Sequence, residues 1–175
     1  MVHDNAERGG QERLALVGFM GAGKSTIGRL LAERLGMPFV DTDAELEKAH
    51  RLSVGEIFSQ RGEPEFRKAE RELILGLLAG EPRVLSVGGG AYVDEEVREA
   101  LDRQATVIWL DPPFELILER LGRSSARPLA SGRPAEELRR LWDARRKAYT
   151  AAHIHIPTSD SAPARFVEAI VEQLD

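Results

Sequence analysis

The sequence predicts an α/β fold in which one parallel β-sheet is covered by helices on both faces. Short apolar runs alternate along the chain with longer segments whose apolar residues recur at helical spacing. This alternation is typical of a parallel sheet whose strands are joined by helices. The chain has 175 residues, and this length favours a single domain with a full hydrophobic core.

The elements follow in chain order. The first strand is predicted at 13–17, and a helix with apolar positions from Ile27 to Leu35 follows it until Gly36 and Pro38. Further strands are predicted at 38–40, 84–87 and 106–110, with a weaker one at 153–156. The other helices are predicted at 64–78, 94–101, 114–121, 135–151 and 163–174.

Two stretches interrupt this alternation, at about 42–71 and about 120–134, and both are too short to fold alone. We therefore expect one domain, 1–175, with two insertions. Residues 1–12 are polar and lack the apolar middle of a secretory signal, so we expect a disordered tail on a cytoplasmic protein. Without cysteines the chain has no disulfide and no zinc–thiolate site, and no apolar run approaches the roughly 20 residues of a membrane span.

The charge of the chain is unevenly distributed. The net charge is -5, which argues against nucleic acid as the main partner. Between Glu119 and Tyr149, however, nine basic side chains stand against four acidic ones. A basic segment in an acidic chain indicates a local anion site. Because no heptad pattern is visible, we expect a monomer.

The strongest motif is the segment from Gly18 to Ser25 (GFMGAGKS), which fits the pattern G-x-x-x-x-G-K-[ST]. Its glycines let backbone N–H groups surround phosphate oxygens, and the following helix N-terminus favours the same anion. Lys24 is placed to reach the terminal phosphates, and the Ser25 hydroxyl to bind Mg²⁺. A chance Gly-rich turn is disfavoured because a strand precedes the motif and a helix follows it. The motif predicts nucleoside triphosphate binding in a three-layer P-loop NTPase fold.

Asp41 and Asp43 stand at the end of the second predicted strand. The carboxyl ends of parallel strands face the ligand crevice of such a sheet. One carboxylate there is suited to Mg²⁺, and the other to accepting a proton from a substrate hydroxyl. Alternatively, one or both cap the helix that begins near Ala44.

Arg67 and Glu70 lie three residues apart on one predicted helix face. Arg67 is suited to bind a substrate carboxylate while Glu70 holds it in place. The alternative is a solvated ion pair of little energetic value.

Gly88, Gly89 and Gly90 end a buried strand. Close approach of a ligand to the backbone is one reason for three glycines there, and a plain turn is the other. In the basic stretch, Arg127 is placed to reach a transferring phosphoryl group from a mobile loop, or else is simply solvated.

Together these residues resemble the shikimate kinase family. The blocks GFMGAGKST, FVDTD, GEPEFRKAE, LSVGGGA, ARPL and RRKAY occur in that family's order between Leu14 and Ile156. The resemblance implies a five-stranded sheet of order 2-3-1-4-5. It also implies Mg²⁺-dependent phosphoryl transfer from ATP to the 3-hydroxyl of shikimate, within aromatic amino-acid biosynthesis.

The resemblance also implies roles for individual residues. Asp43 binds the substrate hydroxyls and acts as base, Asp41 lies near Mg²⁺, and Arg67 and Arg145 bind the substrate carboxylate. The helix reads RRKAY where the family shows R-x-P-L-Y, so Arg146 remains an alternative to Arg145, which keeps the four-residue spacing to the tyrosine. The substrate contacts otherwise fall on Gly88, Gly89, Gly90, Phe58 and Phe66. The nucleotide contacts fall on Gly21, Ala22, Gly23, Lys24, Ser25, Thr26, Arg120 and Arg127.

With these roles, the insertion at 42–71 is expected to bind the substrate and the segment at 120–134 to form a lid. Two other functions remain open. A P-loop kinase of another polyhydroxy acid, such as gluconate, shares the phosphate loop and a basic lid, although the DTD, EFR and GGG blocks argue against it. A nucleotide-dependent switch has no acceptor substrate and no use for a pair of carboxylate-binding arginines.

Overall fold

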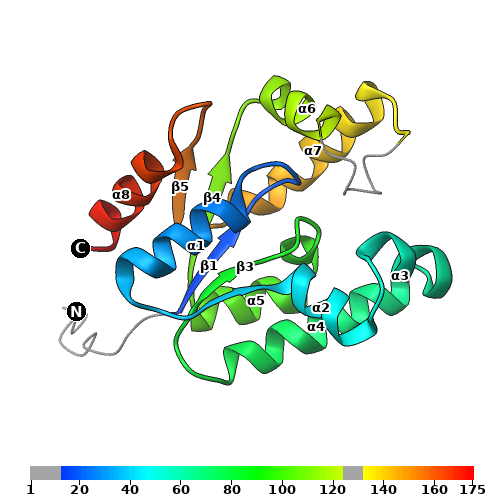
Figure 1. The fold of residues 1–175 in the computed structure, drawn as a ribbon, viewed down its shortest axis with the longest axis horizontal. Coiled ribbons are helices and arrows are strands. Elements are labelled where there is room, and N and C mark those ends of the chain that lie inside the picture. The colour runs from blue at the N-terminus through cyan, green and yellow to red at the C-terminus, as the bar shows by residue number, and fades with distance from the viewer. Residues whose placement is uncertain (1–12, 124–131) are drawn as a thin grey trace.

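A five-stranded parallel sheet forms the centre of the computed structural model, which describes residues 13–123 and 132–175 (Figure 1). The strands lie in the order β2-β3-β1-β4-β5, and every neighbouring pair is parallel. This confirms the strand order that the resemblance implies. The strands are β1 (Leu14–Val17), β2 (Phe39–Asp41), β3 (Val84–Ser86), β4 (Thr106–Asp111) and β5 (Ile154–Pro157).

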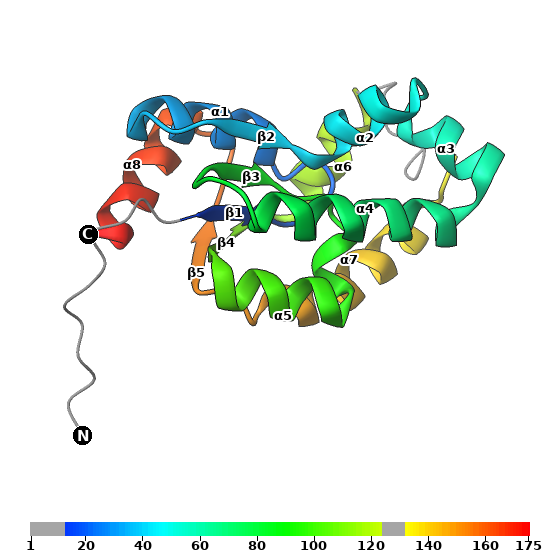
Figure 2. The same ribbon diagram turned by 90° about the horizontal axis from the view of Figure 1, so that it is seen from below.

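Helices cover both faces of the sheet and make the molecule three layers thick. Figure 2 shows α1 and α8 on one face, with α5 and α7 on the other. The helices are α1 (Lys24–Leu35), α2 (Thr42–His50), α3 (Val54–Arg61), α4 (Glu63–Leu78), α5 (Glu95–Gln104), α6 (Phe114–Gly122), α7 (Ala135–Tyr149) and α8 (Pro163–Leu174). A short 3₁₀ helix, η1 (Ala91–Val93), follows β3.

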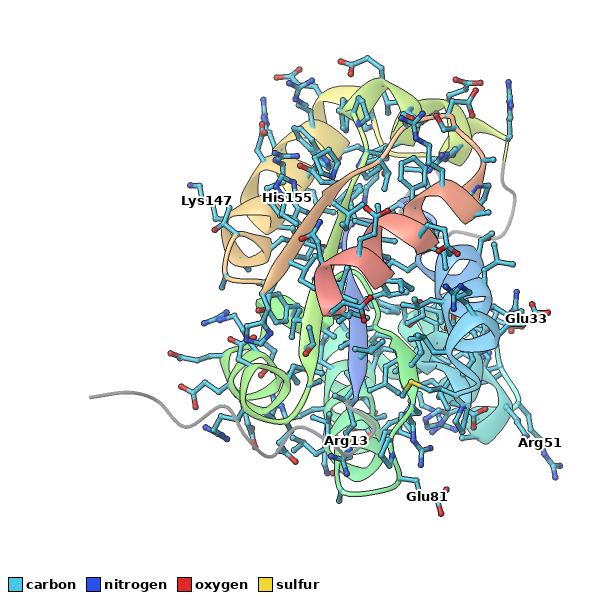
Figure 3. All side chains as sticks on the ribbon, turned by 90° about the vertical axis from the view of Figure 1, so that its left-hand side faces the viewer. Arg13, Glu33, Arg51, Glu81, Lys147 and His155 are labelled. Atoms are coloured by element: carbon cyan, nitrogen blue, oxygen red, sulfur yellow. The ribbon has the colours of Figure 1, made fainter. Side chains whose placement is uncertain are left out.

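The central strand β1 shows why both layers are needed. All four of its residues are buried, and successive side chains point to opposite faces of the sheet. Ala15 and Val17 pack with residues of α4, α5 and α7, whereas Leu14 and Leu16 pack with residues of α1 and α8. At the outside of these layers, charged side chains such as Lys147 point into solvent (Figure 3).

The segment at 42–71 contains more helix than the sequence predicts. It holds α2, α3 and the first half of α4, and the helix after β2 begins at Thr42 instead of near Ala44. The sequence signal for α3 is a capping box, in which Ser53 and Glu56 each accept a hydrogen bond from the other's backbone N–H. Leu46, Ile57 and Phe66 form a small apolar cluster of their own and join the three helices.

Other boundaries shift by a few residues. Asp94 caps α5 instead of belonging to it, and α5 extends to Gln104. Helix α7 ends at Tyr149, two residues before the predicted end. In the part of the chain described here, no helix is long and apolar enough to cross a membrane.

Two helical glycines allow a matched test of the packing between α1 and the sheet. A Cβ on Gly28 would lie 2.7 Å from the Phe39 ring and 2.8 Å from Leu16. Overpacking of this kind destabilises, so Gly28→Ala is expected to lower the free energy of unfolding by about 1–3 kcal/mol.

Gly76 is the control, because a Cβ added there meets nothing within 4 Å. Gly76→Ala is expected to raise the free energy of unfolding by about 0.5–1 kcal/mol, since alanine loses less backbone entropy in a helix. Urea denaturation of both variants is the measurement. Equal effects of the same sign would contradict the packing described for α1.

Candidate active site

The segment between β1 and α1 forms the predicted phosphate-binding loop. Gly18, Gly21 and Gly23 all have positive φ angles, of 146°, 82° and 93°, which residues with side chains rarely adopt. A Cβ on Gly18 would also lie 2.6 Å from the backbone oxygen of Leu110. The glycines of the motif therefore have a geometric role, and the loop leads directly into the N-terminus of α1.

Lys24 and Ser25 begin α1, directly after the phosphate loop. The Lys24 ammonium donates hydrogen bonds to the backbone oxygens of Gly18, at 2.9 Å, and Phe19, at 3.1 Å. It therefore lies across the loop. The Ser25 hydroxyl donates a hydrogen bond to Asp41 and lies 3.5 Å from the hydroxyl oxygen of Ser86.

Asp41 combines the two roles that the sequence leaves open. Its Oδ1 atom accepts hydrogen bonds from the backbone N–H groups of Asp43 and Ala44 and so caps α2. Its Oδ2 atom accepts from Ser25. The capping bonds fix the carboxylate beside the hydroxyl, and they leave the Asp43 side chain outside the cap.

A cavity of about 320 Å³ opens beside this loop. Its wall brings together segments that lie far apart in the sequence: the phosphate loop, α2, α3, the start of α4, the glycine segment after β3, and α7. The predicted residues that line it are Lys24, Ser25, Asp41, Asp43, Phe58, Phe66, Arg67, Gly88, Gly89, Gly90 and Arg145.

Arg67 and Glu70 form an ion pair in this wall, in which Glu70 is buried and Arg67 is partly buried. Arg67 Nη1 donates to Glu70 Oε2 at 2.6 Å, and the Glu70 side chain is 2% exposed. The solvated ion pair considered from the sequence is therefore wrong. Burial raises the pKa of Glu70 against the lowering effect of Arg67, and the second carboxylate oxygen of Glu70 has no hydrogen-bond partner.

Each of the three glycines faces a charged side chain. A Cβ on Gly88 would lie 2.3 Å from a Glu70 carboxylate oxygen, and one on Gly90 would lie 2.4 Å from the Arg67 guanidinium. A Cβ on Gly89 would approach Arg145 Nη1 at 3.3 Å. A plain turn does not require three consecutive glycines. The close packing of this backbone against the charged groups of the cavity does require them.

Arg145 reaches the cavity from α7, and Arg146 does not. The Arg145 side chain is buried, lies over the Phe19 ring at 5.4 Å and lines the cavity. Arg146 instead pairs with Asp111 and stacks on Trp142 and Trp109. The geometry thus favours Arg145, the residue chosen by its spacing to the tyrosine.

The positive charge of Arg145 is only partly offset by the carboxylates of Glu70 and Glu63, which act to raise its pKa. Among the described residues, no carboxylate forms an ion pair with it at 4.0 Å or less. Burial lowers the pKa of Arg145, and the positive charge of Arg67 lowers it further. An anion between Arg67 and Arg145 would relieve both effects.

Asp43 contributes a carboxyl group to the same cavity. Burial raises the pKa of its carboxyl group above the ordinary value of 3.8, and Lys24 partly opposes that shift. Asp41 and Glu47 raise the pKa further. A carboxylate in this state is a stronger proton acceptor than an exposed aspartate.

A second cavity, of about 310 Å³, lies on the other side of the phosphate loop, between α6 and the start of α8. Arg120 lines it and donates hydrogen bonds to the backbone oxygens of Gly21, at 2.9 Å, and Ser159, at 3.4 Å. The other predicted nucleotide residues in its wall are Gly21, Ala22, Gly23 and Thr26. The predicted lid residue Arg127 lies outside the described residues.

Sequence reasoning missed several residues of both cavities. Met20, Ala44, Glu47, Val54 and Val87 also line the first, and the sequence patterns assign none of them a contact, although Met20 lies within the phosphate-loop motif. Thr158, Ser159 and Ser161 line the second, in a segment after the last strand where no contacts were assigned. The buried hydroxyl of Thr158 has no hydrogen-bond partner, but burial is not visible in a sequence.

The residues around Ser25 fit a magnesium ion. Mg²⁺ prefers oxygen ligands and keeps several waters and phosphate oxygens, and Ser25, Asp41 and Ser86 supply only oxygens. Within 13–123 and 132–175, no three His, Cys, Asp or Glu side chains form a cluster suited to a metal. One carboxylate and one hydroxyl would leave the other coordination positions of the ion to water and to the phosphate oxygens of a bound nucleotide.

A glycine-rich phosphate loop at the head of a parallel sheet, beside a small charged cavity, defines a P-loop protein with sites for a nucleotide and for a second small molecule. The sequence profile of the shikimate kinase family matches residues 20–175. The chain therefore belongs to the shikimate kinase family.

Individual relatives agree with this assignment. The shikimate kinase of Caulobacter vibrioides is 44% identical over 92% of this chain and 81% of its own length. That of Zymomonas mobilis is 43% identical, with 92% of each chain covered. Among solved structures, the shikimate kinase of Acinetobacter baumannii in complex with shikimate is 37% identical, with a TM-score of 0.90 over 93% of this chain and 92% of its own.

The raised pKa of Asp43 predicts a dependence of stability on pH. Because the folded-state pKa lies above the unfolded one, the charged carboxylate costs stability at neutral pH. Asp43→Asn is therefore expected to raise the free energy of unfolding of the ligand-free chain at pH 7. The gain should shrink as the pH falls through the raised pKa and vanish below the ordinary value of 3.8.

Urea denaturation with EDTA between pH 3 and pH 8 measures this effect. Asp160→Asn is the control, because Asp160 is exposed and its replacement should leave stability nearly unchanged at every pH. A destabilising Asp43→Asn, or a gain independent of pH, would contradict the electrostatic description of this site.

Proposed function

We propose that this chain transfers the γ-phosphoryl group of ATP to the 3-hydroxyl of shikimate and releases ADP and shikimate 3-phosphate. Family membership supports the reaction, and the geometry of the two cavities supports the assignment of substrates. The nucleotide would lie over the phosphate loop with its base in the cavity lined by Arg120. Shikimate would lie in the cavity lined by Arg67 and Arg145.

One observation carries the assignment of the acceptor site. Two arginines from different helices meet in one small cavity, and Arg145 has no ion pair among the described residues. A carboxylate placed between them replaces repulsion by two charge-assisted contacts. The aromatic rings of Phe58 and Phe66, whose centroids are 4.6 Å apart, form an apolar wall that suits a carbon ring.

The other predicted residues have roles that follow from their positions. Asp43 lines the cavity on the side of Lys24, where it can orient the substrate hydroxyls and accept the proton of the reacting one. Lys24 would leave its carbonyl partners in the loop and bind the terminal phosphate. Gly88, Gly89 and Gly90 let the substrate approach the backbone.

Ser25 and Asp41 would hold Mg²⁺, which neutralises phosphate charge when bound. Arg127, from the segment that we expect to form a lid, would add positive charge at the transferring group. Closure of that lid would exclude water, which otherwise competes with the hydroxyl as acceptor. Positioning and electrostatics then supply most of the catalysis.

We further propose a cytoplasmic monomer that works without a nucleic-acid or membrane partner. The net charge of -5 supports the absence of a nucleic-acid partner. The division into a single domain, a substrate insertion at 42–71, a lid at 120–134 and a disordered tail at 1–12 belongs to the same proposal.

ADP release from Mg-ATP, measured with and without an acceptor, tests the proposed reaction. Shikimate is expected to stimulate release strongly, whereas quinate and gluconate are not. Stimulation by gluconate in place of shikimate would assign the chain to another polyhydroxy acid. ATP binding without stimulation by any acceptor would favour a nucleotide-dependent switch.

Adjacent arginines on α7 provide a matched pair of variants. Arg145→Lys keeps the charge but loses the planar fork that binds a carboxylate in two places. It is expected to raise KM for shikimate by about tenfold, the size of one charge-assisted hydrogen bond. KM for ATP should change little.

Arg146→Lys is the control, because Arg146 contacts Asp111 and two tryptophans outside the cavity. Steady-state kinetics with each substrate varied in turn is the measurement. If Arg146→Lys raised KM for shikimate and Arg145→Lys did not, the assignment of the carboxylate site would be wrong.

A further inference from the structure

Tyr149 is a buried residue for which neither the motif analysis nor the proposed reaction supplies a role. It ends α7, and its side chain is 1% exposed. The ring packs against Trp109 at a centroid distance of 6.0 Å. The hydroxyl group donates a hydrogen bond to the backbone oxygen of Gly89. Tyr149 therefore links the end of α7 to the glycine segment that follows β3.

Arg145 lies beside both Tyr149 and Gly89. It lies four residues before Tyr149, so both side chains share one face of α7. Its Nη1 atom is 3.3 Å from the position that a Gly89 Cβ would occupy. The positive charge of Arg145 lies close enough to the phenol to oppose the rise in its pKa.

The phenol has the right protonation state for this contact. Burial raises the pKa of Tyr149 far above its ordinary value, and the nearby Arg145 and Arg67 only partly oppose the shift. The hydroxyl therefore keeps its proton and donates to Gly89. Its oxygen lone pairs remain able to accept a hydrogen bond from the Arg145 guanidinium.

A link of this kind has an energetic reason. Arg145 has a long side chain and no ion pair among the residues that the structure describes. Ordering such a side chain only when the substrate arrives would cost conformational entropy. A neutral hydroxyl can orient the guanidinium without neutralising it, so the positive charge remains available for the substrate carboxylate.

We propose that Tyr149 is a positioning residue for substrate binding. Its hydroxyl ties the Arg145 guanidinium on α7 to the Gly88–Gly90 segment, and so holds Arg145 in the geometry that receives the substrate carboxylate. This inference rests on the proposed function, in which Arg145 binds that carboxylate. Tyr149 itself does not line the cavity wall and acts through Arg145.

Tyr149→Phe removes the hydroxyl and keeps the ring. It is expected to raise KM for shikimate by about three- to tenfold, the range of one net hydrogen bond. The values of kcat and of KM for ATP should stay within about twofold, because the hydroxyl touches neither the phosphate loop nor Asp43.

Tyr92→Phe is the matched control. Tyr92 is equally buried, and its hydroxyl donates a single hydrogen bond, to Asp102 at 2.6 Å. Neither Tyr92 nor Asp102 lines the cavity, so the variant should keep the wild-type KM for shikimate. A similar loss of affinity in both variants would indicate a general effect of losing a buried hydroxyl and would overturn the positioning role.

A substrate analogue supplies a second readout that a merely structural role would not move. The carboxamide of shikimate lacks the charge that Arg145 is proposed to bind. Tyr149→Phe should therefore lower kcat/KM for shikimate and leave kcat/KM for the carboxamide nearly unchanged. Equal losses with both acceptors would overturn the proposal.

Three further outcomes also test this inference. A Tyr149→Phe chain that fails to fold, while Tyr92→Phe folds, would show that the hydroxyl sustains the fold and would overturn the positioning role. A wild-type chain without shikimate-dependent turnover would overturn the proposed function, and this inference with it. Wild-type turnover with an unaltered Tyr149→Phe enzyme would overturn this inference alone.

Discussion

The parallel pairing of β1 with β3 on one side and β4 on the other is the constraint on which the rest of the structure depends. Because all strands run in the same direction, their carboxyl ends meet at one edge of the sheet, and the segments that follow them must share that edge. The phosphate loop follows β1, Asp41 ends β2, and the glycine segment follows β3. Residues from far apart in the sequence are thereby placed around two adjoining cavities.

The first cavity concentrates charges that are costly to bury. Glu70 and Asp43 have raised pKa values, and that of Arg145 is lowered, in each case mainly because of burial. Their environment does not fully compensate these charges, which is typical of sites that bind charged ligands. The three glycines belong to the same arrangement, because side chains there would collide with the charged groups.

Much of this could be predicted from the sequence, and the exceptions have physical causes. The phosphate loop depends on local backbone geometry, so its motif identifies it directly. Alternating apolar runs predicted all five strands, but α3 lacked a long apolar face and was missed, since its capping box is a short signal. The sequence leaves the environment of Arg67 and Glu70 open, because spacing cannot show that the pair packs against Gly88 and Gly90. Arg145 and Arg146 are neighbours in sequence, and only tertiary packing separates a cavity residue from one stacked on tryptophans.

Arg67 and Arg145 are proposed to receive the carboxylate of the substrate, and the assignment of the acceptor depends on this role. Thermal unfolding of the wild-type chain with shikimate or with its carboxamide, in the absence of nucleotide, tests this claim most directly, because a ligand that binds the folded state raises the melting temperature. Shikimate is expected to raise the melting temperature at concentrations where the carboxamide has little effect. Equal shifts with the two ligands would show that the carboxylate contributes nothing to binding, and would contradict the account.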